Sequence, residues 1–199
     1  GAFRKKDRKG FLLHSNRFLE LMHDTDVLLR TREEFNFDKW LTDARSWGTT
    51  EEEKNLFEKD ATSLVTIWGG DGDPRIFDYS WREWSGLIEN FYLKRWKMFY
   101  DEMLGYLDRG EEYKEEGLPL AYGREAFRAN ELYNKMGDWE MSFVSTYNKA
   151  RTPITEGDEI ETVKRLFKKY LEISKDYYSK EMAADKIKDG KSFENLGED

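Results

Sequence analysis

Histidine and acidic side chains are the first candidates for catalytic or metal-binding chemistry in this 199-residue sequence. A zinc protease helix carries two histidines four positions apart with a glutamate between them. The only histidines, His14 and His23, do not have that spacing, so we predict surface or packing roles for both. Carboxylates are abundant, but no spacing singles out an acid and a base, and in a chain of net charge −8 they are typical of solvated faces.

A glycine-rich turn after Trp68 is the one conspicuous loop of the sequence and offers two candidate sites. Asp71-Gly72-Asp73 matches the start of a calcium-binding loop, but Ile76 stands where glycine is needed and Arg82 where glutamate is needed. The glycines also lack the Lys-Ser/Thr pair of a phosphate-binding loop, and they follow a predicted helix rather than a strand. We therefore predict an ordinary turn, with no metal and no cofactor.

Aromatic side chains on either side of this turn are the strongest candidates for binding. Trp68 precedes the turn, and Ile76, Asp78 and Tyr79 follow it. Aromatic rings at a helix junction can stack on the apolar faces of sugars, while the tyrosine hydroxyl and the carboxylate offer hydrogen bonds. The alternative is that Trp68 and Tyr79 simply close the core over the turn, and the spacing by itself favours that alternative.

Apolar residues recurring every three or four positions predict that helices carry these side chains. The first helix is predicted over residues 3–30. A second is capped by Asn36 and stops at Gly48, and a third starts at Thr49 or Thr50. The third helix is predicted to pack through an apolar stripe of Phe57, Ala61, Leu64 and Trp68. Further stripes start at Trp81, Tyr92, Leu132 and Ile160, and the last continues through Val163 and Phe167.

The fold class follows from these patterns and from the composition. No alternating strand pattern is present, and the 3 prolines fall between predicted helices, which favours an all-α bundle or array of about seven helices. An aromatic content of 16% argues against disorder. Residues 1–180 are predicted to form one helical domain, and residues 181–199 a frayed tail.

Charge and hydropathy exclude several function classes. The sequence has 33 Lys and Arg against 41 Asp and Glu, an excess of carboxylates that repels a phosphate backbone, so nucleic-acid binding is not expected. No run of about 18 apolar residues occurs, so no membrane association is expected. With no cysteine, thiol nucleophiles and thiolate metal sites are excluded.

Several short motifs resemble one known family in order and spacing. They are Thr66-Ile67-Trp68-Gly69, Asp78-Tyr79, Ser85-Gly86-Leu87 and Arg95-Trp96. Together they resemble the C-terminal helical domain of alpha-N-acetylglucosaminidases, glycoside hydrolase family 89. Phe37, Trp40-Leu41 and Ala44-Arg45 are similar to an upstream segment of the same domain. The resemblance covers most of residues 2–171.

This resemblance implies part of an exo-acting retaining hydrolase that removes terminal alpha-linked N-acetylglucosamine from glycans. Such enzymes use two carboxyl groups about 5 Å apart. In the family both are glutamates on a preceding TIM barrel, which this sequence lacks. The chain is therefore expected to be a fragment without catalytic residues and inactive by itself. Trp68, Ile76 and Tyr79 match family positions that line the sugar site, and this reverses the interpretation from core packing to substrate binding.

The resemblance also implies partners and a location. The partners are the catalytic barrel of the same parent chain and a glycan ending in alpha-linked N-acetylglucosamine. Animal relatives are lysosomal and bacterial relatives are commonly exported, to the periplasm or the medium. The absence of cysteine and of any N-x-S/T acceptor favours a bacterial source. The alternative is a free-standing helical glycan-binding or protein-interaction module without catalysis.

Overall fold

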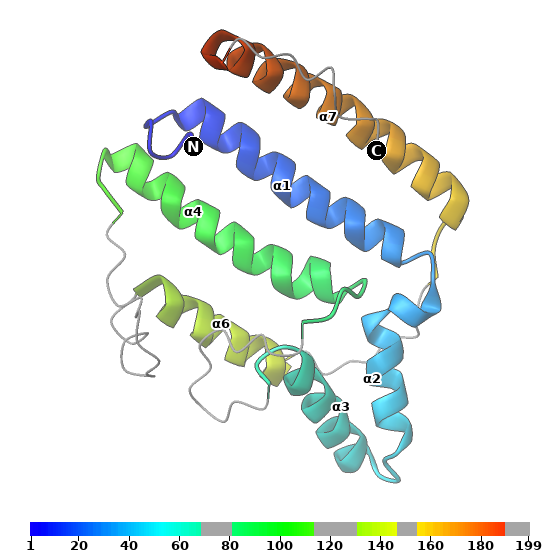
Figure 1. The fold of residues 1–199 in the computed structure, drawn as a ribbon. Coiled ribbons are helices and arrows are strands. Elements are labelled where there is room, and N and C mark those ends of the chain that lie inside the picture. Colours follow the sequence, from blue (N-terminus) through cyan, green and yellow to red (C-terminus); the bar gives the residue numbers. More distant parts are fainter. Residues whose placement is uncertain (69–80, 114–130, 147–154, 190–199) are drawn as a thin grey trace. The chain divides into compact units, whose positions relative to one another are not determined.

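All regular elements among the described residues are helices, which confirms the predicted all-α class (Figure 1). The structure, a computed structural model, describes residues 1–68, 81–113, 131–146 and 155–189. Its α-helices are α1 (Arg8–Leu29), α2 (Phe37–Ser46), α3 (Glu51–Val65), α4 (Leu93–Arg109), α6 (Glu131–Thr146) and α7 (Glu159–Asp189). The chain separates into two compact units, Gly1–Gly157 and Asp158–Asp199, which are described one at a time below.

Helix starts follow the capping chemistry of the sequence. The Asn36 side chain accepts a hydrogen bond from the Asp38 amide at the start of α2, as predicted. Thr50 and Glu53 form a reciprocal capping box at the start of α3. Hydrogen bonds from Thr49 and Thr50 to the Glu53 carboxylate lower the pKa of that group.

Two predicted helix ends are wrong. The first helix begins at Arg8 rather than residue 3, because Asp7 caps it by accepting a hydrogen bond from the Gly10 amide at 2.9 Å. The second does not end in a left-handed glycine at Gly48. It ends at Ser46, followed by Trp47 in the right-handed region, and the Trp47 side chain is 82% exposed.

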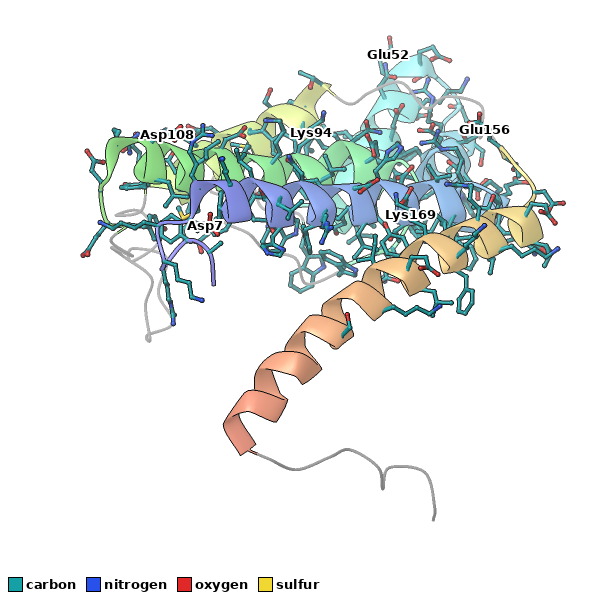
Figure 2. The ribbon with its side chains drawn as sticks, turned by 90° about the horizontal axis from the view of Figure 1, so that it is seen from above. Asp7, Glu52, Lys94, Asp108, Glu156 and Lys169 are labelled. Carbon is teal, nitrogen blue, oxygen red and sulfur yellow. The ribbon has the colours of Figure 1, made fainter. Side chains whose placement is uncertain are left out.

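Helices α1 and α4 form an antiparallel pair in the first unit. The Arg8 guanidinium at the start of α1 bonds the Asp108 carboxylate near the end of α4, with Nε 2.5 Å from Oδ1. Figure 2 accordingly places Asp7 and Asp108 at the same end of the pair. Along the interface the Phe18 ring meets the Trp96 ring edge-on, with centroids 4.9 Å apart. Helix α6 lies along the other side of α4 (Figure 1).

The main core forms where α2, α3 and the segment before α4 meet. Its fully buried side chains include Phe37 and Leu41 of α2, Ile67 just after α3, and Leu87 and Phe91 before α4. The Trp40 indole nitrogen donates to the Ala61 carbonyl at 3.0 Å and so joins α2 to α3. This core supports the chain on both sides of the glycine-rich turn.

Helix α3 packs through a different face from the one predicted. Of the predicted stripe only Ala61 is buried, whereas Phe57, Leu64 and Trp68 are exposed. The buried face carries Glu58, whose carboxylate is paired with the Arg45 guanidinium at 2.6 Å. Because α2 supplies this arginine, a polar face enters the core and the apolar stripe remains at the surface.

The sequence predicted two helices here, one starting at Trp81 and one at Tyr92. The structure has an irregular segment at the start of the first and a single continuous helix after it. Trp81 to Trp84 have no helical structure, and the chain then enters a π-helix, Ile88–Tyr92, that continues directly into α4. Gly86 precedes the π-helix with φ of +85°, a left-handed conformation that favours glycine. Ser85 pairs with Asn36 through an isolated β-bridge, which holds this entry segment against the start of α2.

The second unit is dominated by α7. This helix runs to Asp189, past the predicted start of a frayed tail at residue 181, and residues 190–199 lie outside the described part. Its predicted packing stripe is at the surface, because Ile160, Val163 and Phe167 are exposed. No helix in the described parts of the chain is both long and apolar enough to cross a bilayer.

Candidate functional site

Trp68 stands just past the end of α3 in an unusual backbone conformation. Its φ is +50°, a region that a bulky residue rarely occupies, and its side chain is 47% exposed. Backbone strain of this kind costs on the order of 1–3 kcal/mol and concentrates at functional sites. The structure thus places Trp68 at the surface, where its ring is accessible to a ligand. A side chain that closed the core over the turn would instead be buried.

The residues just before Trp68 explain how it is held there. α3 ends at Val65, and the Thr66 hydroxyl donates back to the Thr62 carbonyl at 2.7 Å. Ile67 is buried in the core at 2% exposure. With Ile67 anchored inward, the sharp turn directs Trp68 outward.

The other two predicted substrate-binding residues, Ile76 and Tyr79, lie outside the described residues. Their prediction therefore stays a prediction. Trp81, the first described residue after them, is also exposed. An aromatic side chain thus stands at each described edge of the glycine-rich turn.

Tyr92 connects the two edges of this turn. Its hydroxyl donates to the Val65 carbonyl at 3.4 Å, three residues before Trp68. On the other side, the Trp81 ring stacks on the Tyr92 ring with centroids 4.1 Å apart. The π-helix ends at Tyr92, and π-helical turns are frequent at functional sites because they reposition side chains.

A buried ion pair supports Tyr92 from α4 and α6. The Arg95 Nε lies 3.0 Å from Glu140 Oε1, and both side chains are at most 10% exposed. The Arg95 guanidinium also lies over the Phe91 ring, 5.3 Å from its centroid. The sequence motifs include Arg95, and Trp139-Glu140 shows a looser similarity to the same family, but the pairing of Arg95 with Glu140 was not predicted because neither residue carries a signal of its partner.

Asp26 is a buried residue near this site that sequence analysis missed. It is fully buried on α1, and its carboxylate accepts hydrogen bonds from the Gly86 amide at 2.6 Å and the Glu89 amide at 3.1 Å. The Arg30 guanidinium pairs with it at 2.8 Å. A signal was present, since Asp26 lies four positions after Met22 and three before Leu29, on the apolar stripe of α1.

Metal chemistry has no candidate in the part of the chain that the structure describes. No group of three or more His, Asp or Glu side chains there is arranged to hold a metal ion. His14 and His23 are both at the surface, as predicted, and His23 Nδ1 lies 2.9 Å from Glu89 Oε2. The described site is thus one of aromatic rings and buried ion pairs.

An all-helical fold with the exposed Trp68 and Trp81 on either side of a glycine-rich stretch of sequence defines the class: a helical domain that presents aromatic side chains at its surface. Comparison with known families is specific. The family described as Alpha-N-acetylglucosaminidase (NAGLU) C-terminal domain matches residues 1–169. The chain belongs to this family, which confirms the resemblance seen in the sequence.

Individual relatives are much longer than this chain. It is 27% identical over 152 residues to human alpha-N-acetylglucosaminidase, a match covering 76% of this chain and 18% of that protein. A solved family 89 glycoside hydrolase from Clostridium perfringens, in complex with PUGNAc, has 27% identity and a TM-score of 0.63, covering 83% of this chain and 18% of that one. Another structure from that organism holds its substrate GlcNAc-alpha-1,4-galactose and has 27% identity and a TM-score of 0.61, covering 84% and 18%.

Proposed function

We propose that the chain is the C-terminal domain of an exo-acting retaining alpha-N-acetylglucosaminidase and forms one wall of its sugar pocket. In this proposal Trp68 stacks on the terminal alpha-linked N-acetylglucosamine, and Ile76 and Tyr79 complete the wall. The observation that carries the proposal is the exposed Trp68 ring, held outward at positive φ by a buried neighbour. Family membership supports the choice of substrate, because the related Clostridium perfringens enzyme is described with an N-acetylglucosamine-containing disaccharide.

The exposed apolar side chains support a catalytic barrel of the same parent chain as the partner. On α3 the exposed Phe57 and Leu64 are seven positions apart and therefore lie on one stripe of the helix, and the exposed Trp68 follows just past the helix end. An exposed apolar stripe is typical of a protein interaction surface. In this arrangement the stripe covers the barrel, and Trp68 at its end reaches the pocket.

Because the proposal puts both catalytic glutamates on the barrel, we expect no hydrolysis by the purified 199-residue chain. The acid/base and the nucleophile of a retaining enzyme are both required for turnover. The measurement is release of the aryl group from an aryl alpha-N-acetylglucosaminide, compared with buffer. Turnover by the chain alone would contradict the proposal that both catalytic glutamates lie on the barrel.

The pocket role is tested by Trp68→Ala in the parent protein. Loss of ring stacking and of buried apolar area should lower kcat/KM for the aryl glycoside about 10- to 100-fold, whereas Trp68→Phe should retain part of the activity. Trp47→Ala is the matched control, because it removes an 82% exposed tryptophan from the end of α2. Wild-type kcat/KM in Trp68→Ala would rule out the pocket role.

A further inference from the structure

A cavity of about 340 Å³ lies between α4, α6 and the segment that enters the π-helix. Its size is within the range of roughly 300–1,000 Å³ that is usual for small-ligand sites. Most of its wall is aromatic, and its lining includes Trp81, Tyr92, Arg95, Trp96, Phe99 and Met136. We call it the aromatic pocket. Among the described residues its lining does not include Trp68, the one predicted substrate-binding residue that the structure describes.

The rings of the aromatic pocket are accessible. Trp81 is 45% exposed and Trp96 is 38% exposed. The Trp81 ring is fixed on one face by its stacking on Tyr92, at an interplanar angle of 28°. Trp96 is held by a stacked contact with Tyr100, with centroids 5.8 Å apart. Two tryptophans fixed by neighbouring rings and still partly open make a preformed stacking surface.

The polar side of the pocket selects the kind of ligand. Arg95 lines the cavity and is paired with Glu140, which is 1% exposed. Since Glu140 offsets the arginine charge, the pocket has little attraction for an anion. A guanidinium nevertheless offers several N–H donors in a fixed plane. Aromatic walls with a charge-neutralised donor suit a neutral ring that carries hydroxyl groups on its edge and C–H groups on its faces.

We propose that the aromatic pocket is a second sugar-binding site, which takes a neutral pyranose unit of the glycan whose terminal residue meets Trp68. This inference rests on the proposed function for the choice of a glycan as ligand. Tyr92 links the two sites, because its ring lines the pocket and its hydroxyl bonds the end of α3 beside Trp68. The enzyme would then bind its substrate at two sites that Tyr92 connects.

The test is a titration of the 199-residue chain with three probes: methyl alpha-N-acetylglucosaminide, methyl galactoside and the disaccharide GlcNAc-alpha-1,4-galactose. Indole N–H signals in NMR spectra, assigned with single Trp→Phe variants, report on each tryptophan separately. We expect saturable shifts at Trp81 and Trp96 with at least one sugar. Shifts at these two signals with N-acetylphenylalaninamide and with no sugar would overturn the proposal in favour of a peptide site, and no shift with any probe would also overturn it.

Substitutions separate this site from the one at Trp68. Trp81→Ala should weaken sugar binding about 5- to 10-fold and Trp81→Phe about 2- to 3-fold, as expected for loss or reduction of one stacked ring. Trp47→Ala should bind like the wild type, and thermal unfolding confirms that each variant is folded. Affinity lost in Trp68→Ala but kept in Trp81→Ala would overturn the second site and leave the proposed function standing. Affinity lost in Trp81→Ala would support the second site even if the parent protein failed to cleave the aryl glycoside.

Discussion

Asp26→Ala is expected to lower the free energy of unfolding by about 3–5 kcal/mol, the range for removing one partner from a buried ion pair. The Asp26 carboxylate has no exposed surface and accepts from two backbone amides, one hydroxyl and one guanidinium. The alanine variant leaves the Gly86 and Glu89 amides without this acceptor. It also removes the negative charge that faces Arg30.

The position of this carboxylate explains why the effect should be large. Gly86 and Glu89 stand at the start of the continuous helix formed by the π-helix and α4, where backbone N–H groups have no intrahelical partner. A negative charge there also interacts favourably with the helix dipole. Asp26 therefore caps this helix from α1, some 60 positions away in the sequence, in the way that an N-cap residue usually does locally.

Urea denaturation followed by circular dichroism measures the change. Asp43→Ala is a suitable control, because Asp43 is an exposed acid on α2 that pairs with Lys39, and we expect a change within about 0.5 kcal/mol there. Asp26→Asn should fall between the two, since the amide oxygen can still accept one backbone hydrogen bond. A loss below about 1 kcal/mol for Asp26→Ala would contradict the capping role.

Arg95→Met is the second substitution with a large expected effect, again about 3–5 kcal/mol in the free energy of unfolding. It leaves Glu140, which is 1% exposed, without the guanidinium that lies 3.0 Å from its carboxylate. The cost comes mainly from this uncompensated buried charge, and a smaller part from the lost contact between the guanidinium and the Phe91 ring.

A double variant distinguishes these two causes. Arg95→Met with Glu140→Leu removes both charges, so most of the stability should return. Chemical denaturation of the wild type, the two single variants and the double variant completes a mutant cycle and gives the coupling energy. Simple addition of the two single effects would show that the pair is not coupled, contrary to the geometry.

These two buried groups also connect stability with the proposed binding surface. Asp26 fixes the entry to the π-helix through Gly86, and Arg95 lies next to Tyr92 at the π-helix end. The guanidinium is 5.9 Å from the centroid of the Tyr92 ring. Substitution of either group should therefore disturb the aromatic pocket as well as the fold, whereas Trp81→Ala should affect binding with little effect on stability.

Much of the secondary structure could be predicted, because helix starts depend on nearby residues. Asn36 caps α2, and Thr50 with Glu53 caps α3, each through hydrogen bonds that span two or three positions. Periodicity located the helices themselves. It failed at the junction before α4, where Gly86 has positive φ and one turn is π-helical. That irregular turn depends on Asp26, which is remote in the sequence.

The motifs around Trp68 indicated the family, which the match over residues 1–169 confirmed, while the packing face of α3 was decided only by tertiary contacts. An apolar stripe shows which face of a helix avoids water, but the partner for that face is chosen by the rest of the molecule. Here Arg45 of α2 neutralises Glu58, so α3 buries that side and leaves Phe57 and Leu64 exposed.

The sequence by itself therefore determined the helical class and the N-terminal caps of α2 and α3, which rest on short-range spacing, and its motifs indicated the family. The tertiary structure decided which charges are buried, where Trp68 points and how Trp81, Tyr92 and Trp96 come together around a cavity. The physical reason is that a buried charge is stable only with its partner in place. Asp26 and Gly86, like Arg95 and Glu140, are partners that only folding brings within hydrogen-bonding distance.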